Sequence, residues 1–224
     1  MRANNITGVL VAALLATTAQ ATTITANGYD EPAGTSVTVN VNGTEYTVWA
    51  GPFLVGVNGG PITLDVFCLD FFTSIDNHAT YSVIVTPPSA ALFQTAAQMY
   101  STYVSNMATA TGAARKLYGA ALQIAIWEVV IDGFNLGTIN DLANGNFRAS
   151  TVTPFATDLN NIVTSYLTSV LGPVAPGTVI YQSANSNIPM QALIGGGGPE
   201  VPEPGTWALL GTGLIGLSFL RRRS

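Results

Sequence analysis

The chain is poor in the residues that carry most protein chemistry. Its 224 residues include one cysteine, Cys68, and one histidine, His78, and only 8% are charged, whereas charged residues usually make up about a quarter of a soluble protein. One cysteine and one histidine cannot build a zinc site, and a lone thiol excludes an internal disulfide. The sequence therefore predicts no metal site and no cofactor.

Basic residues are equally scarce. Between the two ends of the chain, ten acidic residues stand against three basic ones, Arg115, Lys116 and Arg148. Three cations cannot form a basic patch, so nucleic acid is excluded as a partner. Hydrophobic residues make up 48% of the chain, which argues against disorder. The abundance of Ala, Thr, Gly, Ser, Asn and Val is typical of an extracellular protein rich in β-structure.

The first 21 residues have the features of a secretory signal peptide. Arg2 supplies the positive start, residues 8–16 are apolar, and Ala19-Gln20-Ala21 is a small-x-small cleavage site. The pattern predicts export by the Sec machinery and a mature chain that begins at Thr22.

The other end, residues 201–224, carries three elements in a fixed order. Pro202-Glu203-Pro204 precedes an apolar run at 206–220, and Arg221, Arg222 and Arg223 follow. As a helix the run is about 22 Å long, a marginal span for a hydrocarbon core of about 30 Å. The arginines place the C-terminus in the cytoplasm.

These elements resemble the PEP-CTERM sorting signal. The resemblance implies processing by an exosortase, transient residence in the inner membrane of a Gram-negative bacterium, and removal of the tail near the Pro-Glu-Pro motif. The mature protein then reaches the cell surface or the extracellular matrix.

The body, residues 22–194, has the pattern of an α+β domain, and a Gly-rich linker is expected at 195–200. Strands at both ends enclose a block of helices, which predicts a mostly antiparallel β-sandwich or barrel with a helical insertion of about three helices. Expected strands are a hairpin at 37–48 about Asn42-Gly43, then 53–57, 62–69, 81–85, 178–183 and 188–193; expected helices follow Ser89, span 112–131, and follow Thr153-Pro154.

The helix expected at 112–131 is apolar on every side from Leu117 onward, so it must be buried. Gln123 and Glu128 are the only strongly polar residues in this apolar stretch. An unpaired buried amide costs about 1–3 kcal/mol, so Gln123 needs a specific partner or a chemical use. Gly119 and Ala120 extend the same face with small side chains, which lets a second backbone approach Gln123.

Two short motifs together resemble the internal thioester domains of bacterial surface adhesins. These domains carry an aromatic-Cys-apolar-Asp motif, here Phe67-Cys68-Leu69-Asp70, and a later Gln-x-x-apolar-Trp motif, here Gln123 to Trp127. The resemblance implies that the thiolate of Cys68 attacks the side-chain carbonyl of Gln123, that ammonia leaves, and that a thioester remains. Phe67 and Trp127 then keep water away from it.

The same resemblance implies adhesion through covalent capture of an amine or hydroxyl on a surface or matrix polymer. This is single-use chemistry, so the protein is not expected to be an enzyme. Asp70 either orients the thioester site or caps the end of a strand. The thioester also consumes a lone thiol that an oxidising compartment would otherwise attack.

Two other interpretations use the same residues. In the first, Cys68 and Gln123 are core residues of a non-covalent structural or exopolysaccharide-associated matrix protein with the same fold. In the second, Cys68 and His78 form the nucleophile and base of a hydrolase. His78 lies in the polar turn 76–79, and no signature of such enzymes is present, so a loop histidine is the preferred interpretation.

Overall fold

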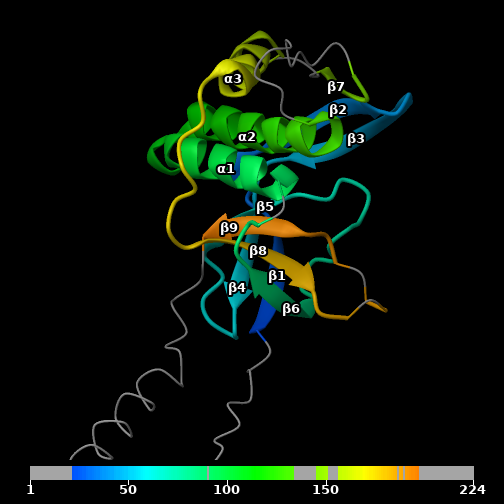
Figure 1. Ribbon diagram of the computed structural model, residues 1–224, viewed down its shortest axis with the longest axis vertical. Helices are drawn as coiled ribbons and strands as arrows, with labels where there is room; N and C mark the ends of the chain where they lie inside the picture. Colours follow the sequence, from blue (N-terminus) through cyan, green and yellow to red (C-terminus); the bar gives the residue numbers. More distant parts are fainter. Residues whose placement is uncertain are drawn as a thin grey trace, which may run out of the picture. The chain divides into compact units, whose positions relative to one another are not determined.

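The computed structural model in Figure 1 describes residues 22–89, 91–133, 145–150, 156–185, 187–188 and 190–196. Residues Ala21–Pro199 form one compact unit with a hydrophobic core of its own. The signal peptide and the C-terminal sorting signal predicted from the sequence lie outside the described residues.

Nine strands, three α-helices and a short 3₁₀ helix make up the described part of the chain. In chain order they are β1 (Thr22–Tyr29), η1 (Glu31–Ala33), β2 (Thr35–Val41), β3 (Thr44–Ala50), β4 (Phe53–Val57), β5 (Leu64–Cys68), β6 (Thr80–Thr86), α1 (Ala91–Thr109), α2 (Gly112–Asp132), β7 (Phe147–Ser150), α3 (Ala156–Thr168), β8 (Thr178–Ser183) and β9 (Leu193–Gly196).

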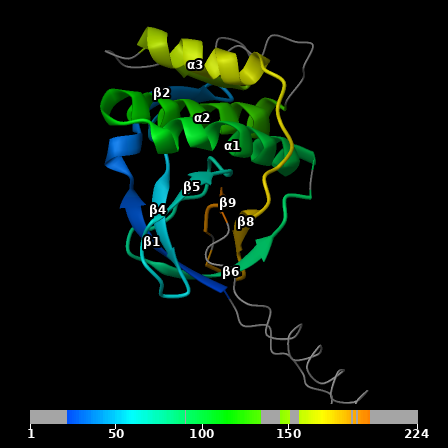
Figure 2. The ribbon, with the colours of Figure 1, turned by 90° about the vertical axis from the view of Figure 1, so that its left-hand side faces the viewer.

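Six strands close into a barrel in the order β1-β4-β5-β9-β8-β6, and β3-β2-β7 form a separate sheet. Every pairing in both sheets is antiparallel. The three helices and β7 are inserted in the chain between β6 and β8. They lie with β2 and β3 over one end of the barrel (Figures 1 and 2). The predicted α+β fold, an antiparallel barrel with a helical insertion, is confirmed.

The β2–β3 hairpin follows directly from local sequence. Val37, Val39 and Val41 are buried on one face, as strict alternation requires. Asn42 and Gly43 have φ angles of 51° and 87°, which are the positive values of a two-residue type I′ turn.

Helix α2 lies at the centre of the layer that the helices form with β2, β3 and β7. It packs against α1, α3 and η1, against all three strands of the separate sheet, and against β5 of the barrel. Every residue from Gly119 to Val129 is buried. A Cβ on Gly119 would overlap the carbonyl oxygen of Ala33, so this position needs glycine for η1 to approach. The helix ends at Asp132, one residue beyond the expected 112–131; Gly133 has φ 82°, and its N–H donates to the Val129 carbonyl at 3.0 Å.

The structure differs from the sequence-based expectation at the last strand. β9 begins at Leu193 and includes Gly195 and Gly196. The sequence analysis ended the last strand at residue 193 and assigned both glycines to the linker. Gly195 lies between Val66 and Val179 in the barrel, and a Cβ there would be 2.6 Å from Cγ1 of Val66. Glycine serves close strand packing here rather than flexibility.

Strands β1 and β7 were not anticipated, because each has few apolar positions. The start of the third helix at Thr153-Pro154 lies outside the described residues, and α3 is described from Ala156. In the part of the chain that is described, no helix is both long and apolar enough to cross a bilayer.

Candidate functional site

Cys68 is the last residue of β5, at a point where one neighbouring strand has already ended. On one side Cys68 pairs with Leu193 of β9. On the other side β4 runs only as far as Phe53, which pairs with Val66. The N–H and C=O of Cys68 therefore face an edge without a strand and need other partners.

The side-chain amide of Gln123 supplies these partners. The Cys68 N–H donates to Oε1 of Gln123 at 2.9 Å, and Nε2 of Gln123 donates to the Cys68 carbonyl oxygen at 2.9 Å. Gln123 is fully buried, and Cys68 is 2% exposed. The amide thus continues the sheet by one residue, and the structure brings together the two residues that the sequence analysis paired across 55 positions.

The thiol of Cys68 has a different partner. Sγ donates to Oε1 of Gln191 at 2.9 Å, and Nε2 of Gln191 donates to the carbonyl oxygen of Asp70. Burial, and secondarily the negative charge of Asp70, raises the pKa of the Cys68 thiol well above its usual value. The resting state is therefore a protonated thiol whose hydrogen is held by Gln191.

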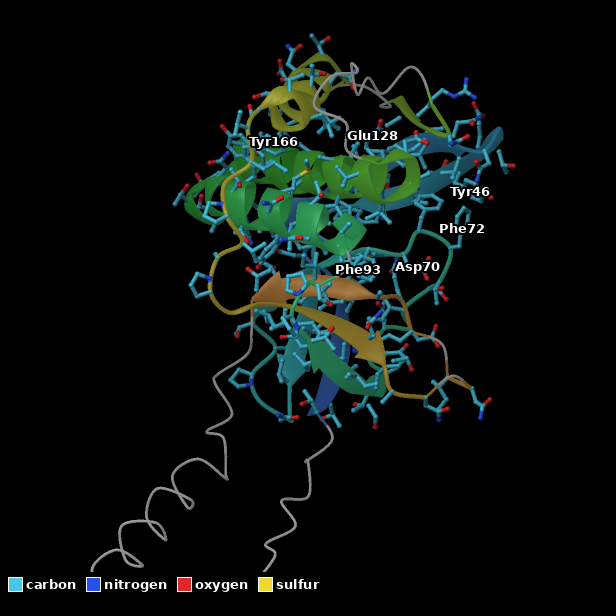
Figure 3. All side chains as sticks on the ribbon, viewed as in Figure 1. Tyr46, Asp70, Phe72, Phe93, Glu128 and Tyr166 are labelled. Carbon is cyan, nitrogen blue, oxygen red and sulfur yellow. The ribbon has the colours of Figure 1, made fainter. Side chains whose placement is uncertain are left out.

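Asp70 caps the loop that follows β5. One carboxylate oxygen accepts the Phe72 N–H at 2.9 Å, and the other accepts the Thr73 hydroxyl. Figure 3 shows Asp70 and Phe72 on this loop, at the level between the helices and the barrel. These hydrogen bonds are those of a capping carboxylate, the second of the two roles considered for this residue.

The two aromatic residues of the motifs lie on different sides of β5. Phe67 is fully buried and packs on Tyr100, with ring centroids 6.0 Å apart. Trp127 packs edge to face on Phe71 at 5.2 Å and lies 6.3 Å from Phe147. Phe67 and Cys68 are neighbours in a strand, so their side chains point to opposite faces. Trp127 of α2 lines the same hollow as Cys68 and is therefore on the side of the thiol.

Two hollows flank this region. The smaller, about 260 Å³, is lined by Cys68, Gln191 and Trp127 among others. The larger, about 530 Å³, is lined by Asp70, Phe72 and Phe93, among others, and not by Cys68. His78 lies in the turn before β6 with φ 64° and lines neither hollow. Among the described residues, no three His, Cys, Asp or Glu side chains gather as metal ligands.

Gln191 is the site residue that sequence analysis missed. The available signal was a glutamine inside the apolar stretch 188–194, which raises the same question of a buried amide that Gln123 raised. No short-range pattern, however, links position 191 to position 68.

Comparison with known proteins identifies a sorting motif near the C-terminus. The PEP-CTERM protein-sorting motif matches residues 200–223, which include the Pro-Glu-Pro and the three arginines. No curated protein and no solved structure matches the chain. The chain is thus an exported protein that ends in a PEP-CTERM motif, is processed by an exosortase at the membrane, and is delivered to the cell surface.

Proposed function

We propose that this surface protein forms an internal thioester between Cys68 and Gln123 and uses it to attach covalently to a nucleophile on a surface or matrix polymer. The observation that carries the proposal is the pair of 2.9 Å hydrogen bonds that hold the Gln123 amide on the Cys68 backbone. Fixed proximity of this kind is what makes an amide, a poor electrophile, open to attack.

The hydrogen bonds also favour the reaction electronically. When sulfur attacks Cδ of Gln123, negative charge develops on Oε1, and the Cys68 N–H already donates to that oxygen. The carbon–nitrogen bond then breaks, and the thiol proton and the departing NH₂ group together form ammonia. Burial of both residues keeps water from hydrolysing the thioester.

Gln191 is also an amide next to the sulfur, but its geometry suits another role. The thiol approaches its oxygen, as a hydrogen-bond donor, whereas attack requires approach to the carbon. Gln191 orients the thiol and holds its proton. The chemistry is used once, so the protein acts as a tether rather than as an enzyme; Sec export and transient residence in the inner membrane complete this proposal.

Two observations favour a second candidate, a non-covalent matrix protein of the same fold. The Gln123 amide completes the sheet edge at Cys68, and the raised pKa of the thiol disfavours the thiolate. A purely structural pair needs nothing more.

Intact mass of the unreduced mature body, residues 22–199, separates the two candidates. With a thioester the wild type is lighter than its sequence by one ammonia, Cys68→Ala and Gln123→Ala have their full masses, and Gln191→Leu still loses ammonia. If the wild type has its full mass, the structural candidate stands. If Gln123→Ala still loses ammonia and Gln191→Leu does not, Gln191 is the acyl partner. Thiol titration must be done in denaturant, because Cys68 is shielded in the fold whether or not it has reacted.

A further inference from the structure

The 260 Å³ hollow is the one of the two described above that Cys68 lines. Aromatic side chains from four elements line it: Tyr29 of β1, Trp49 of β3, Phe53 of β4 and Trp127 of α2. Hydroxyl side chains of two exposed residues, Thr47 and Ser74, also line it. Pockets that bind drug-sized ligands are about 300–1,000 Å³, so this one fits a smaller unit.

No charged side chain is among the described residues that line this pocket. Asp70 lines the other hollow and accepts hydrogen bonds from Phe72 and Thr73. A lysine ammonium would enter without a counter-ion, at a high desolvation cost, or would first lose a proton with a pKa of about 10.4. A neutral hydroxyl pays neither cost.

Trp127 supplies an unused donor beside the thiol. Its indole is 3% exposed, and Nε1 has no hydrogen-bond partner within the described ranges. A buried donor left without a partner destabilises the fold, and a ligand oxygen is a partner that would relieve this cost. Nε1 of Trp49 also has none, but it packs against Gly34 and Gly51, so Trp49 contributes its ring.

Aromatic faces, hydroxyl groups at exposed residues and one indole donor match a pyranose ring, which has apolar C–H faces and a polar rim. We propose that this pocket binds one neutral sugar unit of a polysaccharide and presents its hydroxyl to the thioester. The inference rests on the proposed function and adds the substrate class.

The transfer step balances with the groups present. The sugar oxygen attacks the thioester carbonyl carbon contributed by Gln123, the carbon–sulfur bond breaks, and an ester forms between the sugar and the Gln123 side chain. The hydroxyl proton passes to the sulfur of Cys68. The resulting thiol can again donate to Gln191, as Sγ does at 2.9 Å in the structure, where Gln123 still carries its amide.

The test starts from the mature body, residues 22–199, with its mass checked for the loss of one ammonia. It is incubated at pH 7 with methyl glucoside, methyl galactoside, Nα-acetyl-lysine or methylamine, and adducts are followed by intact mass. We expect at least one glycoside to add tenfold faster than acetyl-lysine. Methylamine is smaller than any of these and needs no fit to the pocket walls, so its adduct reports that the thioester has formed.

Two variants test the pocket. Thr47→Trp blocks an exposed lining residue and should lower the glycoside rate at least tenfold with the methylamine rate unchanged. The matched control is Thr44→Trp, on the same strand and also exposed but not lining the pocket; it should react like wild type. Trp127→Phe removes the donor together with part of the ring, and it should slow the glycosides more than methylamine.

The outcomes separate the two proposals. If ammonia is lost and methylamine adds, but no glycoside adds or only acetyl-lysine does, the sugar inference is overturned and the thioester stands. If no ammonia is lost, the proposed function fails, and with it the transfer step. Quenching of tryptophan fluorescence by the same glycosides in Cys68→Ala then shows whether the pocket binds sugar without chemistry.

Discussion

The substitution Gln123→Glu tests the buried amide at the centre of the site. A protonated glutamic acid can reproduce both hydrogen bonds, since its O–H replaces the Nε2 donor to the Cys68 carbonyl. An ionised one cannot, because it offers no donor and buries a charge at a position with no exposure. The folded-state pKa of the introduced carboxyl should therefore lie well above its unfolded value of about 4.3.

The pH dependence has a defined sign and size. Below about pH 4.3 the carboxyl is protonated in both states, and the variant should be close to its parent in stability. Above that pH only the unfolded chain ionises, and each further unit costs the fold about 1.4 kcal/mol. If the folded pKa exceeds 7, the loss at pH 7 is about 3.5 kcal/mol.

Urea unfolding at pH 4, 5, 6 and 7 measures this loss. Both proteins should carry Cys68→Ala, so that no thioester contributes to either. Gln94→Glu is the control, because Gln94 is exposed on α1 and an ionised carboxylate there costs nothing. A difference between the Gln123→Glu protein and its parent that stays constant from pH 4 to pH 7 would show that water reaches position 123, and would refute the buried-site argument.

Two further predictions concern the elements that hold the site. Gly119→Ala should destabilise by about 1–2 kcal/mol despite the better helix propensity of alanine, because its Cβ meets the Ala33 backbone, whereas Gly172→Ala, whose Cβ would be 3.5 Å from Thr102 Oγ1, should be neutral or stabilising in the same urea titration. Arg115→Met should lose about 1.5–3 kcal/mol at pH 7, because Arg115 bridges Asp30 at 2.6 Å and Asp65 at 3.2 Å. The pKa of Asp65 is already raised, by burial first and by Asp30 second, and removing the Arg115 cation raises it further. The stability of the variant therefore falls as pH rises through the folded-state pKa of Asp65, and the difference from wild type should shrink toward pH 4. The exposed neighbour variant Lys116→Met should show neither effect, and an Arg115→Met loss that does not change with pH would contradict the assignment.

Much of the fold was predictable because its signals are local. The Asn42-Gly43 turn and the apolar stretch of α2 each need only a few neighbouring residues to be recognised, and both were found. The pairing of Cys68 with Gln123 is non-local: the cost of a buried amide predicted that Gln123 has a partner or a chemical use, and the resemblance to thioester domains indicated Cys68. Here the cost of an unpaired polar group gave information that periodicity does not carry.

The remaining differences come from tertiary pairing that no local pattern encodes. β7 is a strand because its residues pair with β2. Gly195 is in a strand because it pairs with Val66 and Val179, and it is a glycine because Val66 leaves no room for a side chain. Gln191 lies in the connection between β8 and β9, and the pairing of β9 with β5 brings it beside Cys68, 123 positions away. The glycine-rich composition of residues 195–200 predicted a linker, but Gly195 and Gly196 are part of β9 in the barrel.

Burial of the thiol affects the proposed thioester in two opposite ways. The raised pKa makes the thiolate scarce, so closure depends on the fixed position of the Gln123 amide rather than on a reactive sulfur. Once formed, the thioester is neutral, and the same apolar surroundings that oppose the thiolate leave water little access to it. In this proposal the thioester forms slowly and then persists, and it reacts with a nucleophile that enters the aromatic pocket. That combination suits a protein that must cross a membrane and be sorted before it meets its target.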